Sequence, residues 1–152
     1  MREHDVLKPG AKLGKYRIER HIGGGKHTAV YQAWHPNFKD GIALKTLRAS
    51  EDCPSDIEQR FRREAQAIQN LKHPNVIRVY DFGIEGDVYY LVMEFVPGKT
   101  LRDLISAHPT GLGKDAVLRL FGQLASAVAL AHDQHIVHGN IKPDNVLLDE
   151  SQ

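Results

Sequence analysis

The sequence is poor in several features that would point to particular classes of protein. Its single cysteine, Cys53, excludes an internal disulfide framework and fits a reducing compartment. No stretch approaches the ~20 apolar residues that cross a bilayer, and the N-terminal stretch MREHDVLKPGAKLGKY lacks the apolar segment of a signal peptide. Formal net charge is only +1, so no overall field favours nucleic acid or acidic membranes. We therefore expect a cytoplasmic protein.

The composition that remains is typical of a globular protein. Hydrophobic residues make up 41% of the 152 residues and charged residues 26%, which suits one compact unit with a buried core. Glycine and proline separate short stretches of strand character. The stretches predict five strands, over residues 15–22, 28–34, 41–48, 76–82 and 87–95.

One helix is predicted between the third and fourth strands. Ser55 and Glu58 have the spacing of a capping box, and the helical pattern continues to about residue 70 or 71. After Pro97-Gly98 the pattern becomes helical again, over residues 100–107 and from about 115 to 135. This order predicts an α+β fold with a sheet-rich half followed by a helical half.

Two charged residues stand where the pattern calls for apolar ones. Glu64 lies within the apolar stripe of the first predicted helix, and Lys45 lies in a strand that is apolar on both faces. A buried carboxylate without a partner is costly, so the two side chains could pair. Alternatively, Lys45 extends to water and Glu64 lies at the helix edge. The pattern alone leaves both arrangements open.

Five motifs follow one another along the chain: IGGGKHTAV, IALK, REAQAIQNLKHPNVI, YLVMEFVPGKTL and HGNIKPDNVLL. In this order they resemble the motifs of the protein kinase family, in particular those of the bacterial-type serine/threonine kinases. The resemblance implies a five-stranded antiparallel N-lobe sheet with one helix, followed by part of a helical C-lobe. It places a short extension at 1–14, the N-lobe at 15–96, and the hinge exit with the start of the C-lobe at 97–152.

The resemblance also implies an ATP site. Lys45 would contact the α and β phosphates and pair with Glu64, and Met93 would occupy the gatekeeper position. The Glu94 carbonyl and the Val96 amide would contact the nucleotide at the hinge. The remaining residues of the implied site cover the phosphates (Ile22, Gly23, Gly24, Gly25, Val30) or enclose the adenine (Val30, Ala43, Leu147).

The catalytic loop is implied by residues 138–145, HGNIKPDN. Lys142 would approach the γ-phosphate, and Asn145 would bind Mg²⁺. Asn140 stands where the family has an aspartate that accepts the proton of the substrate hydroxyl. Because an amide cannot accept that proton, we expect impaired phosphotransfer.

Further departures from the family concern control and completeness. Gly139 replaces the arginine that would hold a phosphorylated activation loop, and Thr28 replaces a glycine of the phosphate-covering loop. The sequence ends at Gln152, before the Asp-Phe-Gly metal site, so we expect a truncated kinase-like chain with weakened Mg²⁺ binding. Asp81-Phe82-Gly83 spells that motif too early, and we interpret it as a strand end and turn.

The long predicted helix at 115–135 is apolar around most of its circumference. Such a helix needs cover on all sides, so we expect an exposed apolar patch that invites a homodimer, a protein partner or aggregation. The apolar positions are Val117, Leu118, Leu120, Phe121, Leu124, Val128 and Leu130.

Other interpretations of single motifs are weaker. GGGKHT lacks the first glycine of a Walker A loop, because that position is Arg20, and a dinucleotide fingerprint would need a helix after the glycines. His132, His135 and His138 suggest a zinc site only if all three share one face.

Three hypotheses for function therefore remain. In the first, the chain transfers phosphate from ATP to serine or threonine; in the second, it binds a nucleotide or a protein partner without turnover; in the third, it retains no activity.

Overall fold

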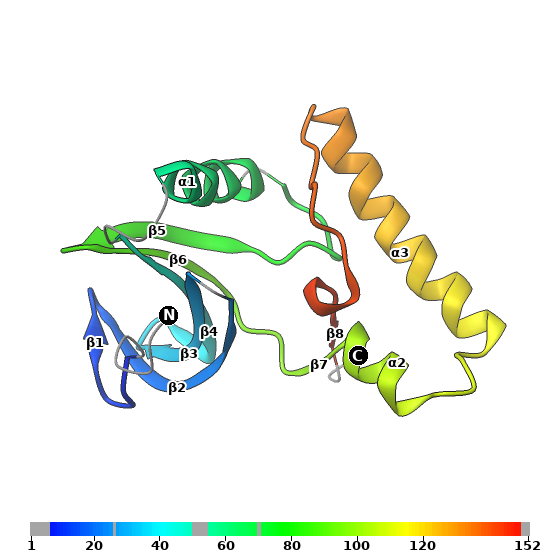
Figure 1. Cartoon of the computed structure of the whole chain (residues 1–152), viewed down its shortest axis with the longest axis horizontal. Coiled ribbons are helices and arrows are strands. Elements are labelled where there is room, and N and C mark those ends of the chain that lie inside the picture. Colours follow the sequence, from blue (N-terminus) through cyan, green and yellow to red (C-terminus); the bar gives the residue numbers. More distant parts are fainter. Residues whose placement is uncertain (1–6, 26, 50–54, 70, 150–152) are drawn as a thin grey trace. The chain divides into compact units, whose positions relative to one another are not determined.

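The computed structural model describes residues 7–25, 27–49, 55–69 and 71–149 (Figure 1). The chain divides into two compact units. Unit 1 comprises residues 1–70 and 78–95, and unit 2 comprises residues 71–77 and 96–152. Within the described ranges, no helix has the length and hydropathy needed to cross a membrane.

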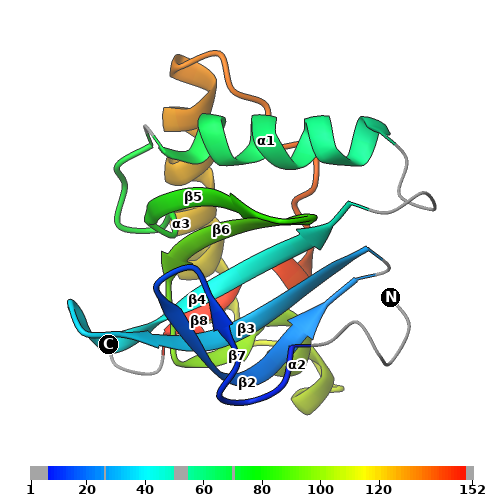
Figure 2. The same cartoon turned by 90° about the vertical axis from the view of Figure 1, so that its left-hand side faces the viewer.

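Unit 1 is an antiparallel sheet with one helix (Figure 2). The strand order is β1-β2-β3-β4-β6-β5, which confirms the predicted protein-kinase-like sheet and adds one short edge strand at the N-terminus. The strands are β1 (Lys12–Leu13), β2 (Tyr16–Gly24), β3 (Thr28–His35), β4 (Phe38–Arg48), β5 (Val79–Glu85) and β6 (Val88–Glu94).

The helix α1 (Ser55–Gln69) begins at the predicted residue and packs against β5. The side chains of Ser55 and Glu58 lie outside the described part of the chain, so the predicted capping box stays a prediction. Strand β4 begins at Phe38, earlier than expected, because Phe38 pairs with His35 and shortens the turn before it.

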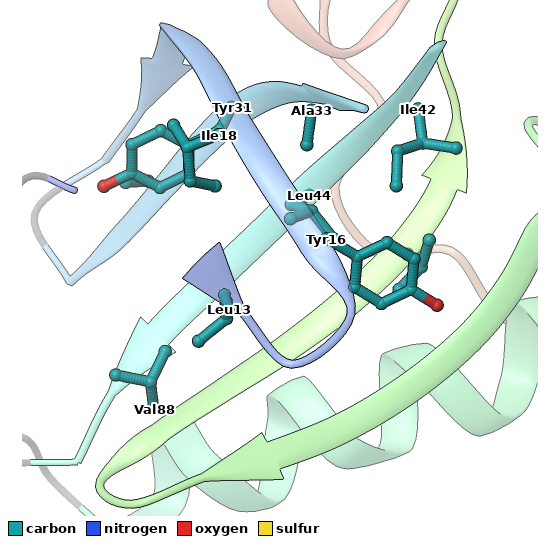
Figure 3. Packing of buried hydrophobic residues seen from close by; sticks show 10 residues of the cluster. Leu13, Tyr16, Ile18, Tyr31, Ala33, Ile42, Leu44 and Val88 are labelled. Atoms are coloured by element: carbon teal, nitrogen blue, oxygen red, sulfur yellow. The ribbon is translucent and has the colours of Figure 1, made fainter. Parts of the chain in front are cut away.

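Strand β4 buries both of its faces, as its sequence predicts. Ile42 and Leu44 belong to a core cluster with residues of β1, β2, β3 and β6, whose side chains Figure 3 shows among these strands. Leu47 belongs to a second cluster, in which Phe61 and Ala65 of α1 cover Leu91 of β6. Alternation along one strand thus supplies both cores.

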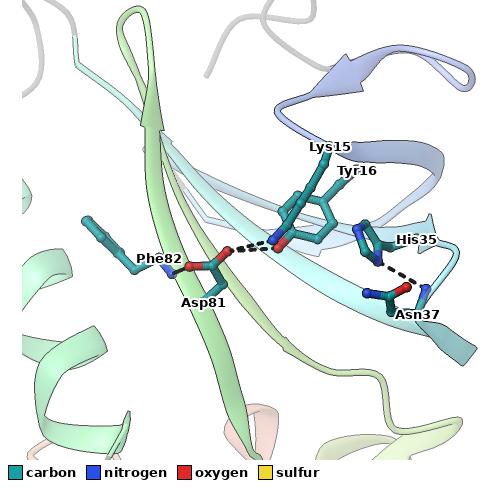
Figure 4. Close-up of polar contacts among 6 residues, drawn as sticks. All are labelled: Lys15, Tyr16, His35, Asn37, Asp81 and Phe82. Atoms are coloured by element: carbon teal, nitrogen blue, oxygen red, sulfur yellow. Dashed lines mark hydrogen bonds and ion pairs between the residues drawn. The ribbon is translucent and has the colours of Figure 1, made fainter.

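Strand β5 corrects one prediction. Asp81-Phe82-Gly83 lies inside β5, because its pairing with β6 continues to Glu85 opposite Val88. The Asp81 carboxylate accepts a hydrogen bond from the Tyr16 hydroxyl at 3.0 Å and lies 3.4 Å from the Lys15 ammonium group (Figure 4). These contacts join the β2 side of the sheet to the opposite edge strand, so the sheet must curl.

Asp81 and Tyr16 affect each other's ionisation. Burial alone would raise the pKa of Asp81, but hydrogen bonds from Tyr16 and the Phe82 amide, together with Lys15, outweigh it and lower the pKa below 3.8. Burial and then the hydrogen bond to Asp81 raise the pKa of Tyr16. The ionised carboxylate and the neutral phenol are therefore the favoured pair.

Unit 2 is mainly helical. Its elements are β7 (Gly98–Thr100), α2 (Leu101–Ala107), α3 (Lys114–Asp133), a 3-10 turn η2 (Pro143–Asn145) and β8 (Leu147–Asp149). The segment 71–77 joins this unit through a hydrogen bond of 3.0 Å between the side chains of His73 and Ser126 of α3. The prediction placed His135 at the end of α3, but the helix stops at Asp133 and His135 has φ +59°.

We predict that Tyr16→Phe lowers the free energy of unfolding at pH 7 by about 1–2 kcal/mol, because the bond to an ionised carboxylate is lost. The folded-state pKa of Asp81 is lowered, so its stabilisation exists above the unfolded-state pKa and is lost as pH falls through the folded-state value. The destabilisation should therefore shrink below about pH 4.

The measurement is urea unfolding between pH 7 and pH 3. Tyr31→Phe is the matched control, because the hydroxyl of Tyr31 accepts a bond from the Leu7 amide rather than facing a carboxylate. A Tyr16→Phe effect that stays constant across this range would contradict the prediction.

Candidate functional site

One row of directly opposed residues crosses five strands of unit 1. Residues that lie directly opposite each other in a sheet share a face, so the side chains of this row lie on one face of the sheet. Phe61 of α1 covers the β5–β6 end of this face through Leu91 and Leu47. The row consists of Gly23, Val30, Lys45, Leu91 and Phe82.

The neighbouring row carries the predicted adenine and gatekeeper residues. Ala43 lies opposite Met93 and two residues from Lys45 on the same face. Ala43 is buried, with 5% of its surface exposed, whereas Val30 and Met93 are half-buried. Glu94 follows Met93, and its amide donates a hydrogen bond of 2.9 Å to the Arg78 carbonyl. The fold thus places small and apolar side chains beside Lys45.

The glycine-rich segment comprises the last two residues of β2, Gly23 and Gly24, and Gly25 directly after them. The Gly25 amide donates to the Thr28 carbonyl at 2.9 Å, and Gly24 lies opposite Ala29 with φ +154°. A Cβ on Gly24 would lie 2.4 Å from the Thr28 carbonyl oxygen, whereas a Cβ on Gly23 would meet nothing within 4 Å. The close approach of Gly24 to β3 therefore leaves no room for a side chain, whereas Gly23 leaves open space above the sheet.

Lys45 is half-buried in the middle of this face. Its Nζ atom lies 5.8 Å from the centroid of the Phe61 ring, within the range of a cation–π contact. The side chain of Glu64 lies outside the described part of the chain, so its pairing with Lys45 stays a prediction. Ile22 is 38% exposed at the end of β2.

The second part of the predicted site is the loop around η2, in unit 2. The Asn145 side-chain amide donates to the Asn140 carbonyl at 2.8 Å, and the Asn145 backbone amide donates to the Lys142 carbonyl at 2.9 Å. The Asn140 backbone amide donates to His138 Nδ1 at 3.2 Å. The exposed side chains of Asn140 and Lys142 therefore belong to one loop that is bonded internally.

Gly139 has a left-handed backbone, with φ +69°. A residue with a Cβ is strained in this region. The glycine at this position therefore carries no charge and adopts a backbone conformation that a residue with a Cβ would adopt only with strain.

Two short strands fix the end of this loop. Leu147 lies opposite Thr100, and the Leu101 amide donates to the Val146 carbonyl at 2.8 Å. Arg102 Nη2 lies 3.6 Å from Asp144 Oδ2. The sequence analysis missed β7 and β8, because each is only three residues long.

Thr100 and Asp103 form a capping box at the start of α2, which was also missed although its T-x-x-D pattern is visible. The Thr100 hydroxyl and amide both donate to the Asp103 carboxylate, and these bonds lower the pKa of Asp103. This cap fixes the first residue of α2 directly after β7.

The predicted residues are divided between the two units. Unit 2 holds Val96, Asn140, Lys142, Asn145 and Leu147, and unit 1 holds the others. Among the residues that the structure describes, no group of three or more His, Cys, Asp or Glu side chains is arranged to hold a metal ion. His132, His135 and His138 are included in that statement.

The sequence matches the protein kinase domain family over residues 16–152. The chain therefore belongs to the protein kinase family, as the motifs predicted.

Relatives and solved structures agree with this assignment. The serine/threonine-protein kinase PrkC of Bacillus subtilis is 44% identical over 136 residues, and pkn2 of Myxococcus xanthus is 36% identical over 138. The match covers 90% of this chain and 21% of PrkC, and 91% of this chain and 16% of pkn2. The chain therefore spans about a fifth of the length of such curated kinases.

The kinase domain of PknI from Mycobacterium tuberculosis has the same fold. Its crystal structure superposes with a TM-score of 0.82 at 27% identity, and the match covers 97% of this chain and 60% of the PknI chain. This likeness confirms the predicted fold class.

We predict that Gly24→Ala lowers the free energy of unfolding by about 1–3 kcal/mol, because its Cβ would overlap the backbone at the start of β3. Gly23→Ala is the matched control and should change stability by less than about 1 kcal/mol, since its Cβ meets open space. Urea unfolding of both variants tests this. Equal losses would show that the close approach at Gly24 is unimportant.

Proposed function

We propose that this chain is a serine/threonine-kinase-like unit that binds ATP but transfers its phosphate slowly or not at all. The observation that carries the proposal is Asn140 in an otherwise ordered catalytic loop. Family membership supports ATP as the ligand, and the residues of this chain support the impaired transfer.

Asn140 supports slow transfer for a chemical reason. A side-chain amide can hydrogen-bond a substrate hydroxyl but cannot take its proton near neutral pH. A positioned general base contributes typically about 10²–10⁴ in rate, so a loss of that size is expected. The loop around Asn140 has internal hydrogen bonds. The proposed slow transfer therefore rests on the chemistry of Asn140 and not on disorder of the loop.

The face of unit 1 around Lys45 supports nucleotide binding. Val30, Ala43 and Met93 offer apolar surface for the adenine ring, and Lys45 offers a cation for the phosphates. Gly23 has no side chain and leaves room for the phosphates to approach the backbone. In unit 2, the exposed side chain of Lys142 is a separate candidate for contact with a phosphate. These residues bind and orient the nucleotide and need no proton transfer.

Mg²⁺ fits this proposal as a weakly held partner of the phosphates. The Asn145 Nδ2 donates to Asn140, which leaves the Asn145 Oδ1 as a ligand atom, and oxygen is the ligand that Mg²⁺ prefers. Asp144 beside it pairs with Arg102. When bound with ATP, the ion would neutralise phosphate charge, and Asn145 would orient it.

A second candidate is an active serine/threonine kinase in which this chain is one part of a longer chain or complex. The limited coverage of PrkC and PknI favours it. Asn140 argues against it, because a longer chain would not restore a base at this position.

A third candidate is a unit that binds a protein partner or a second copy of itself. Leu118 and Phe121 on α3 are 60% and 71% exposed, as the sequence predicts for this helix. The same face borders an apolar groove of about 400 Å³, lined by Phe121, Leu124, Ala125, Val128, Ala129, His132 and Ile141. Exposed apolar surface of this kind favours association.

We predict that ATP raises the melting temperature of the chain and that Mg²⁺ enlarges the increase modestly. Ligand at about 100 times its dissociation constant adds about 2.7 kcal/mol of stability, which is a shift of several degrees. Thermal-shift titration with and without Mg²⁺ is the measurement, and Lys45→Met is the matched variant that should lose most of the shift. If ATP leaves the melting temperature of the wild-type chain unchanged, the proposal that the chain binds ATP is contradicted.

We also predict little or no transfer of radiolabelled phosphate from ATP to a serine/threonine protein substrate or to the chain itself. The missing base at Asn140 is the reason. Lys45→Met serves as the blank for contaminating kinases. Robust transfer by the wild-type chain that disappears in Lys45→Met would contradict the proposed impairment.

A further inference from the structure

The ring of Phe61 lies where the side chain of Lys45 emerges from the sheet. Lys45 Nζ is 5.8 Å from the ring centroid. Both residues belong to unit 1, and Phe61 is 4% exposed. A buried aromatic side chain therefore faces the cation to which the proposed function assigns the phosphates.

Packing holds this ring in place from several sides. Phe61 contacts a cluster that contains Leu47, two residues from Lys45 on its own strand, and Leu91, which lies directly opposite Lys45. Phe82 lies opposite Leu91, and its ring centroid is 6.1 Å from that of Phe61, with the planes inclined by 47°. The neighbours of Lys45 in the sheet thus also fix the ring.

We propose that Phe61 is a positioning residue for Lys45, which holds the ammonium group over its face in the orientation that receives nucleotide phosphates. The inference rests on the proposed function for its consequence, since it assumes that Lys45 binds phosphate. A lysine side chain is long and flexible, and the negative face of an aromatic ring attracts an ammonium group. Lys45 has other interactions beside this one, and the ring acts together with them.

The attraction can be separated from packing by changing the electrons of the ring rather than its shape. Site-specific incorporation of 3,4,5-trifluorophenylalanine at position 61 keeps a ring of similar size but weakens its negative face. The same amino acid at position 38 is the matched control. Phe38 is partly buried and packs against the other core cluster, with His35 and Tyr80 as its aromatic neighbours.

The first readout needs no nucleotide. The chain is treated with an amine-reactive ester at fixed pH, and mass spectrometry compares acylation of Lys45 with that of Lys114, an exposed lysine of α3. We expect fluorination at position 61 to raise the relative acylation of Lys45 about two- to five-fold, the size of a modest cation–π attraction. Fluorination at position 38 should leave it unchanged.

The second readout is the dissociation constant for ATP, which should rise by a similar factor on fluorination at position 61. Phe61→Tyr should retain wild-type values in both readouts, and Phe61→Leu should behave like the fluorinated chain. Circular dichroism verifies that each variant folds, and the near-isosteric fluorinated ring covers the case in which Phe61→Leu does not.

Unchanged Lys45 acylation after fluorination at position 61, or an equal change from position 38, would overturn the proposal. If the wild-type chain fails to bind ATP, the proposed function fails, while the acylation comparison still decides whether Phe61 positions Lys45. The two failures are therefore distinguishable.

Discussion

The structure of unit 1 depends on strand β4, which carries apolar side chains on both faces and therefore has to be covered on both sides. Ile42 and Leu44 point into the core that the curled strands share, and Leu47 points into the core that α1 covers. A strand with two apolar faces is stable only when a layer packs on each side. The curl of the sheet provides one layer and α1 provides the other. The Tyr16–Asp81 bond joins the two sides of the curled sheet.

This constraint explains why Lys45 is informative. A lysine in such a strand gives up part of its hydration, which costs free energy. Leu47, Leu91 and the ring of Phe61 lie around it and restrict its side chain. A cation held in this way is suited to bind an anion, and under the proposed function that anion is the phosphate group of a nucleotide.

The sequence predicted those parts of the molecule that periodicity or a motif encodes. The main strands, α1 and α3 were found because apolar spacing marks them, and Asn140 was recognised from its motif. Strand β1, β7 and β8 were missed because elements of two or three residues have no period. The place of Asp81-Phe82-Gly83 inside β5 depends on pairing with β6, which is a long-range contact. The contact of Phe61 with Lys45 depends on where α1 packs, which spacing alone does not give.

The central claim is that a nucleotide site persists around Lys45 although the proton acceptor of the catalytic loop is absent. Two-dimensional NMR of the labelled chain during titration with ATP tests it most directly. The account predicts saturable shifts at Gly23, Val30, Ala43 and Lys45, while the exposed face of α3 at Leu118 stays unchanged. Absence of shifts, or shifts spread over the whole chain without saturation, would contradict it.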